Sequence, residues 1–233
     1  MEGDTMTEKI NSNNQAVLAG EIISEFEYSH DVFGERFYQT KMKVNRLSHV
    51  YDTIPLLVSD RLMDVTTSFV GEFVEVRGQF RSYNKHENNR NHLVLSLFVR
   101  EFILLGDLSS RIPNAIFLDG YICKEPVYRI TPLGREITDI LLAVNRAYSK
   151  SDYIPCICWG RNARYAGNLA VGSRIQIWGR MQSRQYQKRT GDGREENRTA
   201  YEISASKIEY IVDYNINQAV ADSAVSQKPL KSG

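Results

Sequence analysis

Cysteine is scarce in this chain, with three in 233 residues (Cys123, Cys156 and Cys158), and this scarcity excludes a disulfide framework. Cys156 and Cys158 lie two apart in an apolar run, so both should point to the same side of a strand and be buried there. A metal site at these cysteines would need more ligands, yet all four histidines lie in the other half of the chain: His30, His49, His86 and His92. We therefore predict neither a metal nor a cofactor.

Long apolar runs are also lacking. No stretch approaches the ~18 apolar residues of a membrane-spanning helix, and the N-terminal residues do not resemble a secretory signal. We therefore expect a cytoplasmic protein with no membrane partner.

Catalytic sets are missing as well. The sequence shows no nucleophile with its base and no phosphate-binding loop. The "GDG" at 191–193 is followed by a strand-like segment instead of a helix, so it predicts a hairpin turn. We predict that the chain is not an enzyme and takes no small-molecule substrate.

What the chain does contain is an internal repeat. When residue 14 is written above residue 114, a series of identical residues coincides at one offset: Gly20/Gly120, Ile22/Ile122, Glu25/Glu125, Tyr28/Tyr128, Gly34/Gly134, Val44-Asn45-Arg46 with Val144-Asn145-Arg146, Asp52/Asp152 and Ile54-Pro55 with Ile154-Pro155. After one inserted residue, Val70-Gly71 matches Val171-Gly172 and Gly78 matches Gly179. A repeat of this length has the size of a small domain. We predict two copies of one domain, residues 14–105 and 114–212, joined by a linker at 106–113 and flanked by flexible segments at 1–13 and 213–233.

Each copy is predicted to consist mainly of strands. In the second copy, period-two alternation marks strands at 114–123, 136–146, 153–159, 173–186 and 199–211, with a helix-like segment at 161–171 between the third and the fourth. Five strands with a helix in that place follow the order of the OB-fold, a Greek-key barrel. We predict an all-β protein of two tandem OB-folds, each with a short helix between its third and fourth strands. Glycines suit the bent strands of such barrels, here Gly20, Gly78, Gly120 and Gly179.

One face of two strands in the second copy is rich in rings and arginines. Alternation along the fourth strand places an apolar set inward (Ile175, Ile177, Gly179, Met181) and a mixed set outward (Trp178, Arg180, Gln182, Arg184, Tyr186). Along the third strand, Ile154, Cys156 and Cys158 face inward, and Tyr153, Pro155, Ile157 and Trp159 face outward.

Outward rings have two interpretations. They can cover a barrel edge or an oligomer contact, or they can form a stacking platform for single-stranded nucleic acid. Charge favours the second interpretation. The formal charge of residues 114–212 is +5 and that of residues 14–113 is −2, so positive charge gathers in the copy that carries the rings, where a polyanion would favour it.

Residues 153–211, "YIPCICWGRNARYAGNLAVGSRIQIWGRMQSRQYQKRTGDGREENRTAYEISASKIEYI", resemble the bacterial single-stranded DNA-binding protein family. The shared pattern is an aromatic-Gly-Arg strand end, an alanine-bearing helix and a "GS-x-I-x-I-x-G-x-M-x-S-R-x-Y" strand before a glycine-containing hairpin. The resemblance implies an OB-fold that binds single-stranded DNA without sequence preference, in replication, recombination or repair. It assigns stacking to Tyr153, Trp159 and Tyr186, and Tyr148 is the nearest match for a further ring in the preceding loop.

Together with alternation, this implies a DNA face in the second copy. To the stacking rings we add Trp178, and the groups expected to meet phosphates are Arg146, Arg161, Arg180, Arg184, Lys188 and Arg189.

The first copy departs from the pattern. The positions that match the three stacking rings are Thr53, Ser59 and Lys85, none of them aromatic. We expect a degenerate, ring-poor site that binds weakly through charge and serves chiefly in assembly, made of Arg77, Arg81, Tyr83 and Lys85. The final "AVSQKPLKSG" also lacks the acidic tip by which the family recruits partners, so recruitment by that route is not expected.

Assembly and function each keep an alternative. The family's working unit has four OB-folds, which favours a homodimer of this chain, but a monomer whose two copies pack on each other also fits. For function, the alternative is a primosome-type interaction scaffold that binds protein partners first and nucleic acid second.

Overall fold

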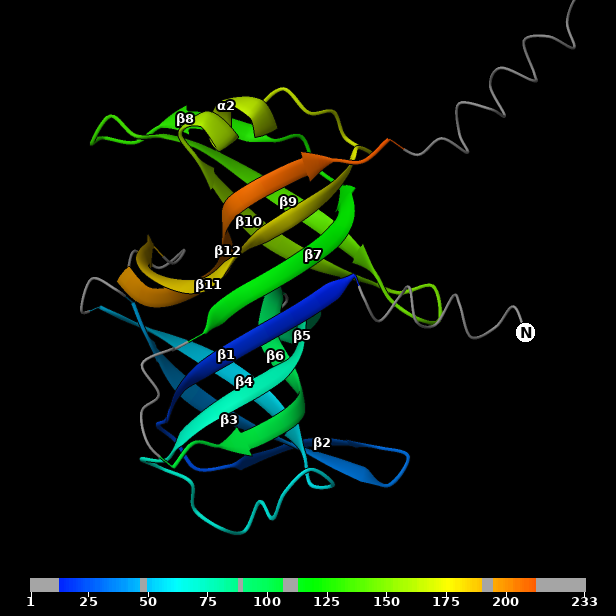
Figure 1. The fold of residues 1–233 in the computed structure, drawn as a ribbon, viewed down its shortest axis with the longest axis vertical. Coiled ribbons are helices and arrows are strands. Elements are labelled where there is room, and N and C mark those ends of the chain that lie inside the picture. Colours follow the sequence, from blue (N-terminus) through cyan, green and yellow to red (C-terminus); the bar gives the residue numbers. More distant parts are fainter. Residues whose placement is uncertain (1–12, 47–49, 88–89, 107–112, 190–194, 213–233) are drawn as a thin grey trace, which may run out of the picture.

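The structure, a computed structural model, describes residues 13–46, 50–87, 90–106, 113–189 and 195–212, with only the backbone described at 85–87, 90–92, 188–189 and 196. These residues form two β-barrels, one above the other in Figure 1. The strands of the first are β1 (Asn14–Ile22), β2 (Glu27–Val32), β3 (Glu35–Asn45), β4 (Tyr51–Ser59), β5 (Phe73–Glu87) and β6 (Arg90–Leu104). The second contains β7 (Asn114–Ile122), β8 (Val127–Ile130), β9 (Glu136–Asn145), β10 (Ser151–Trp159), the helix α2 (Arg161–Ala166), β11 (Arg174–Arg189) and β12 (Glu195–Tyr210).

Each barrel closes in the order predicted for an OB-fold. In the first, β1 pairs with β3 and β5, β3 with β4, β4 in parallel with β6, and β6 with β5. The same set of pairings recurs from β7 to β12. Closure requires close approach of the backbones, because a Cβ on Gly120 would lie 2.5 Å from the carbonyl oxygen of Ala143. The prediction of two tandem OB-folds is confirmed.

Alternation along the strands builds the two cores. Ile154, Cys156 and Cys158 are all buried, as predicted from their spacing, and so are Ile175, Ile177 and Met181. Burial of such side chains is the main source of stability of a small barrel. It also raises the pKa of Cys158 to about 12 and that of Cys156 well above its ordinary value, so both thiols stay protonated.

Two details of the predicted strand order are wrong. Each barrel has an additional short strand, β2 or β8, which forms a hairpin with the next strand. In addition, only the second barrel has the helix, because residues 60–72 of the first form turns. In these turns the carboxylate of Asp64 accepts hydrogen bonds from the backbone N–H of Thr66 at 3.0 Å and from the hydroxyls of Thr66 and Thr67. Such local bonds compete with a helix.

The two barrels join along their first strands. β1 and β7 pair antiparallel through the middle of the molecule, with Ala16 opposite Ile116, so that all the strands form one sheet (Figure 1). The Asn14 side chain donates to the carbonyl of Phe80 and accepts from its N–H, and Asn114 makes the same pair of bonds with Met181. Each barrel therefore makes equivalent contacts across the boundary, as the two subunits of a symmetric dimer do.

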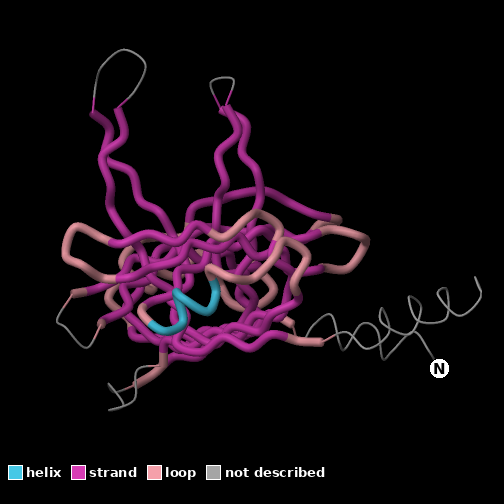
Figure 2. Tube along the Cα trace, turned by 90° about the horizontal axis from the view of Figure 1, so that it is seen from above, coloured by secondary structure: helices cyan, strands magenta, loops and turns pink. Residues whose placement is uncertain are grey.

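Two long hairpins, β5–β6 and β11–β12, project from the same side of the body (Figure 2). In the part of the chain that the structure describes, no helix is long and apolar enough to cross a membrane.

Candidate nucleic-acid interface

The predicted stacking residues lie on the outer face of β10 and β11, but these strands are not neighbours. The last strand, β12, lies between them, with Ser204 opposite both Ile157 of β10 and Arg180 of β11. Ser204 was not among the residues predicted for this face. Its position follows only from the parallel pairing of β10 with β12, which brings together strands distant in the sequence.

Three of the predicted rings are accessible on this face. Tyr153, Trp159 and Tyr186 are 43%, 37% and 38% exposed, unusually open for large aromatic side chains. The indole Nε1 of Trp159 donates to Ser204 Oγ at 3.2 Å, which fixes the ring over β12. The guanidinium of Arg184 lies 5.7 Å from the centroid of the Tyr186 ring. On this face, the ring of Trp159 is therefore fixed by a hydrogen bond, and the ring of Tyr186 lies beside a cation.

The face is not open along its whole length. Ile157 and Gln182 were predicted to point outward, yet they are only 5% and 7% exposed. The Gln182 side chain donates to the buried carboxylate of Glu202 at 2.7 Å. Alternation predicts the direction of a side chain but not what its neighbours cover. The accessible rings therefore surround a closed patch.

Trp178 differs from the other predicted rings. It packs on Phe117 of β7 with ring centroids 5.1 Å apart, and the ammonium of Lys207 lies 4.4 Å from its own centroid. Both neighbours lie directly opposite it on adjacent strands. The ring of Trp178 therefore contacts side chains of β7 and β12.

The predicted cations of the second barrel fall into two groups. Arg161, Arg180 and Arg184 are exposed, and none has an ion pair with any described residue. Arg146 is different, because its Nη1 lies 3.4 Å from the buried carboxylate of Asp152 at the boundary with the first barrel. The side chains of Lys188 and Arg189 lie outside the described residues.

Tyr148 lies in the tight loop between β9 and β10 and is 94% exposed. The loop closes by a 2.8 Å bond from the N–H of Arg146 to the carbonyl of Lys150, and both Tyr148 and Ser149 have positive φ, 60° and 52°. Non-glycine residues in this conformation are strained, and such strain is frequent at binding sites. The loop therefore holds an open ring at the end of the second barrel.

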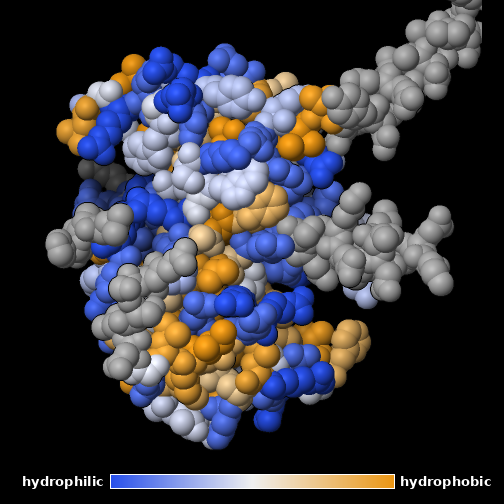
Figure 3. All heavy atoms as spheres, viewed as in Figure 1, coloured by the Kyte–Doolittle hydropathy of each residue, from blue (hydrophilic) through white to orange (hydrophobic). Residues whose placement is uncertain are grey.

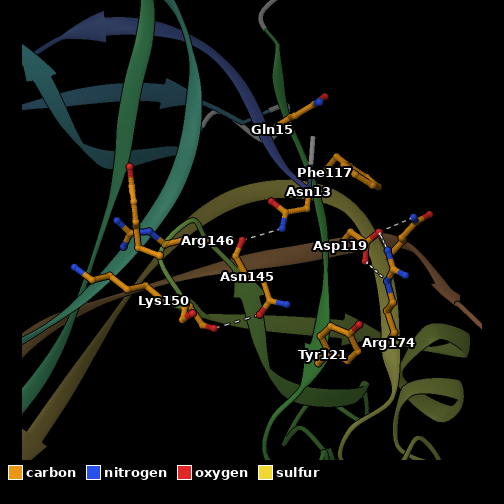
Figure 4. A pocket seen from close by; sticks show the side chains of 13 residues that line it. Asn13, Gln15, Phe117, Asp119, Tyr121, Asn145, Arg146, Lys150 and Arg174 are labelled. Carbon is orange, nitrogen blue, oxygen red and sulfur yellow. Dashed lines mark hydrogen bonds and ion pairs between the residues drawn. The ribbon is translucent and has the colours of Figure 1, made fainter. Parts of the chain in front are cut away.

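The same loop borders a cavity of about 980 Å³ (Figure 4). On its far side, Asp119 is held by both Nε and Nη2 of Arg174, at 2.9 and 3.0 Å, and by the Gln176 amide. These paired groups leave Arg146 and Lys150 as the cations on the loop side of the cavity.

The corresponding positions of the first barrel have the expected residues. Thr53 and Ser59 lie on β4 without a ring, and Arg77 is neutralised by Glu75 at 2.8 Å and Glu101 at 3.5 Å. Tyr83 is 42% exposed, and the side chain of Lys85 lies outside the described residues.

The first barrel nevertheless has a ring-lined groove, made mostly by residues other than those of its predicted site. The groove has a volume of about 920 Å³, and its rings come from the β2–β3 hairpin, β5 and β6: Tyr28, His30, Phe33, Phe37, Tyr83 and Phe98. Phe33 is fully exposed at a turn with φ of 49°. Phe98 lies under two guanidiniums, those of Arg81 at 5.4 Å and Arg100 at 4.9 Å.

The ring of Phe98 was not predicted, because it lies on a strand that is not equivalent to the strand of Trp159. The strand pairings match Phe98 of β6 to Ser204 of β12, the residue that Trp159 covers. The second barrel therefore has the ring on its third main strand, β10 (Trp159, hydrogen-bonded to Ser204), and the first has it on its last strand, β6 (Phe98, paired with Leu57 of β4). Comparing single aligned positions hides this exchange. Extending the repeat to the last strand would have revealed it.

Two equivalent carboxylates, Asp52 and Asp152, are buried at the boundary between the barrels. Asp52 receives Nε and Nη2 of Arg46 at 2.7 and 2.5 Å and the N–H of Ser183 at 2.6 Å. Burial alone would raise its pKa, but these bonds outweigh burial and lower the pKa below its ordinary value.

Asp152 is less well compensated. It accepts the N–H of Ser82 at 2.8 Å, while Arg146 and Arg81 remain at 3.4 and 3.9 Å. Burial therefore prevails, and the pKa of Asp152 is raised.

The sequence of the second barrel is similar to those of known proteins. Residues 113–211 match the model of the single-strand binding protein family. The single-stranded DNA-binding protein of Clostridium tetani is 32% identical over 105 residues, 42% of this chain and 70% of that relative. Single-stranded DNA-binding protein A of Bacillus subtilis is 35% identical over 85 residues, 34% of this chain and 49% of that relative. The chain thus spans 70% of one of these relatives and about half of the other.

The solved structure of the wild-type single-stranded DNA-binding protein from Thermus aquaticus has the same fold. It superposes with a TM-score of 0.63 at 16% identity, over 94% of this chain and 96% of that one. The fold and the face of rings and arginines define the class: a tandem OB-fold protein. The chain belongs to the single-strand binding protein family.

Proposed function

We propose that this protein binds and protects single-stranded DNA without sequence preference, in replication, recombination or repair. The observation that carries the proposal is the outer face of β10–β12–β11, where the accessible rings Tyr153, Trp159 and Tyr186 share a surface with exposed arginines. Family membership agrees with this activity and with the prediction that the chain is not an enzyme.

The binding mode follows from the chemistry of the face. Every base has a π-face, so stacking on an aromatic ring holds a strand without reading its sequence, at roughly 1–3 kcal/mol per base. Arg161, Arg180 and Arg184 have no carboxylate partner among the described residues, so phosphates would not have to displace one. Duplex DNA offers no base faces to the rings. Binding should therefore be selective for single strands and should weaken as salt rises.

The first barrel contributes a second contact surface in this proposal. The rings of its groove, together with Arg81, have the same chemistry as the face of the second barrel, although they come from other strands. Tyr153 connects the two surfaces, because its N–H donates to the hydroxyl of Ser82, which lines the groove, at 2.6 Å. We accordingly revise the expected role of the first barrel from charge-based binding to stacking.

Tryptophan fluorescence tests the function directly, since both tryptophans, Trp159 and Trp178, lie in the second barrel. Titration with oligo-dT should quench the emission, and duplex DNA of equal length should not. Trp159→Phe should remove most of the quenching, whereas Trp178→Phe should retain it, because Trp178 packs on Phe117. If neither short nor long oligo-dT binds at low salt, the proposed function is wrong, and the scaffold alternative becomes the better explanation of the rings.

We further propose that two chains associate, giving four OB-folds. This is supported by outward rings on the central strands, where Phe117 and Trp178 are only half-buried, and by the apolar residues that gather on the same face over the first barrel (Figure 3). Light scattering coupled to size exclusion should give twice the chain mass of 26.7 kDa, and a single-chain mass would refute the dimer. We expect the protein in the cytoplasm or nucleoid, an expectation that the bacterial relatives and the proposed ligand support.

A further inference from the structure

A small polar cleft of about 250 Å³ lies between the two barrels. Four cationic side chains line it: Arg81 of β5, Arg100 of β6, and Arg146 and Lys150 from the two ends of the β9–β10 loop. Figure 4 shows Arg146 and Lys150 reaching from that loop toward the strands of the first barrel. Among the described residues, the only acidic side chain that lines the cleft is Asp152. Positive charge is therefore in excess.

The cations of the cleft have few partners. Arg81 and Arg146 share the single carboxylate, and Arg81 also donates to the Gln79 side chain. Arg100 lies over the ring of Phe98, and neither Arg100 nor Lys150 has an ion pair with any described residue. Two buried polar atoms here have no hydrogen-bond partner in the described part of the chain: Nε of Arg81, a donor, and Oδ2 of Asp152, an acceptor. An anion can satisfy only the donor. Buried polar atoms are normally satisfied, so unpaired ones indicate a missing water, ion or ligand.

The shortage of partners also affects the ionisation of Arg81. Burial, followed by repulsion from Arg146, lowers its pKa to about 10, and Asp152 offsets only part of this effect. An anion in the cleft would relieve both the repulsion and the unpaired Nε.

The opposite boundary of the same molecule provides an internal comparison. There, Arg46 pairs with Asp52 through two hydrogen bonds, and the strand pairings match Gln182 to Arg81 and Ser206 to Arg100. Among the residues that the structure describes, the surplus of cations therefore exists on one side only. It arises from residues that the symmetric barrel contact does not need.

The cleft also connects the two surfaces of the proposed DNA-binding face. Arg81 and Arg146 line both the cleft and the groove of the first barrel, and Tyr148 lines both the cleft and the cavity beside the second. Asp152 directly precedes Tyr153, the stacking position nearest to the first barrel.

We propose that this cleft binds a phosphodiester of the single strand, at the point where the strand crosses from the second barrel to the first. Arg81, Arg100, Arg146 and Lys150 are the groups that hold it. This assignment rests on the proposed function and specifies the path of the strand. It predicts that the cleft matters only for strands long enough to reach both barrels.

The test replaces the two extra cations by their counterparts at the opposite boundary, in the double variant Arg81→Gln and Arg100→Ser. A matched control, Arg36→Gln with Lys43→Gln, removes the same charge from first-barrel cations that are already paired with carboxylates. An OB-fold occupies about 4–16 nucleotides, so oligo-dT of about 8 nucleotides fits one barrel and oligo-dT of about 35 reaches both. Circular dichroism melts verify that both variants fold.

For the long oligonucleotide, the cleft variant should bind about ten-fold more weakly than wild type, since each missing hydrogen bond is charge-assisted. The slope of log affinity against log salt concentration should become shallower by about 0.7 for each phosphate that the variant no longer neutralises. For the short oligonucleotide, Trp159 quenching and the affinity derived from it, which report the second barrel, should not change. The control should bind both lengths like wild type.

Three results would overturn the proposal: equal losses for both lengths, a loss no larger than that of the control, or unchanged binding of the long strand. Titration with inorganic phosphate tests whether the cleft binds free phosphate and not a phosphodiester of DNA. If it saturates the cleft at millimolar concentration, protects only the wild-type fold and leaves long-strand binding unaffected, the cleft is a site for free phosphate. Absence of binding of either length at low salt refutes the proposed function itself, an outcome distinct from failure at the cleft.

Discussion

Replacing Asp52 by asparagine should destabilise the protein far more than the same change at Asp152. Asparagine keeps an acceptor for the N–H of Ser183 but loses the ion pair with Arg46, in which two bonds of 2.7 and 2.5 Å reach a fully buried carboxylate. Breaking a buried ion pair from one side costs about 3–5 kcal/mol. Arg46 keeps 24% of its side chain in water, so we expect a loss of about 2–3 kcal/mol in the free energy of unfolding.

Asp152→Asn should stay within about 1 kcal/mol of wild type, because it removes a buried charge whose cations lie at 3.4 and 3.9 Å. The two sites should also respond oppositely to pH. The lowered pKa of Asp52 means that its stabilisation is present above the ordinary carboxyl range and is lost as pH falls through the lowered value. The raised pKa of Asp152 means that its contribution is present in acid and is lost as pH rises through the raised value.

Urea unfolding followed by circular dichroism, from about pH 7 to about pH 3, measures both effects. The difference between wild type and Asp52→Asn should shrink toward acid. Any advantage of Asp152→Asn should be largest near neutral pH. Equal destabilisation by the two variants at neutral pH would refute the reasoning, because it would show that bond geometry at these carboxylates does not govern stability.

Three further predictions concern the rings, the glycines and the thiols. Tyr186→Ala should weaken oligo-dT binding by about 1–3 kcal/mol in a fluorescence titration, and an effect no larger than that of Tyr165→Ala, a ring on α2, would contradict a stacking role. Gly120→Ala should cost about 1–3 kcal/mol in thermal or urea unfolding, because its Cβ would lie 2.5 Å from the Ala143 carbonyl, while Gly106→Ala, with open space around it, should be neutral. A thiol reagent near pH 8 should label Cys123 alone in the native protein and all three thiols in denaturant; rapid labelling of Cys158 would contradict its burial.

Most of the fold could be predicted from local pattern. Alternation at Ile154, Cys156 and Cys158 identified a core strand, and the repeat identified a second copy of the domain. The missing helix at 60–72 could not be predicted from the repeat, because repeats do not conserve local hydrogen bonds such as those that Asp64 accepts from Thr66.

The site was predictable where it depends on direction and not where it depends on neighbours. Tyr153, Trp159 and Tyr186 are accessible as expected, whereas Ile157 is covered and Trp178 packs on Phe117. Direction is a property of the pleat of one strand. Whether an outward side chain is covered depends on the neighbouring strands, and the alternation along one strand does not predict which strands those are.

The strands, their inward faces, the repeat and the concentration of positive charge in the second copy can all be predicted from local sequence, because each depends on side chains along one segment. The position of β12 between β10 and β11, the substitution of Phe98 for the missing ring of the first barrel, and the meeting of Arg81, Arg100, Arg146 and Lys150 around Asp152 depend on the folding of the whole chain. These contacts join residues up to about 70 positions apart, and their geometry is set by barrel closure and by the pairing of β1 with β7.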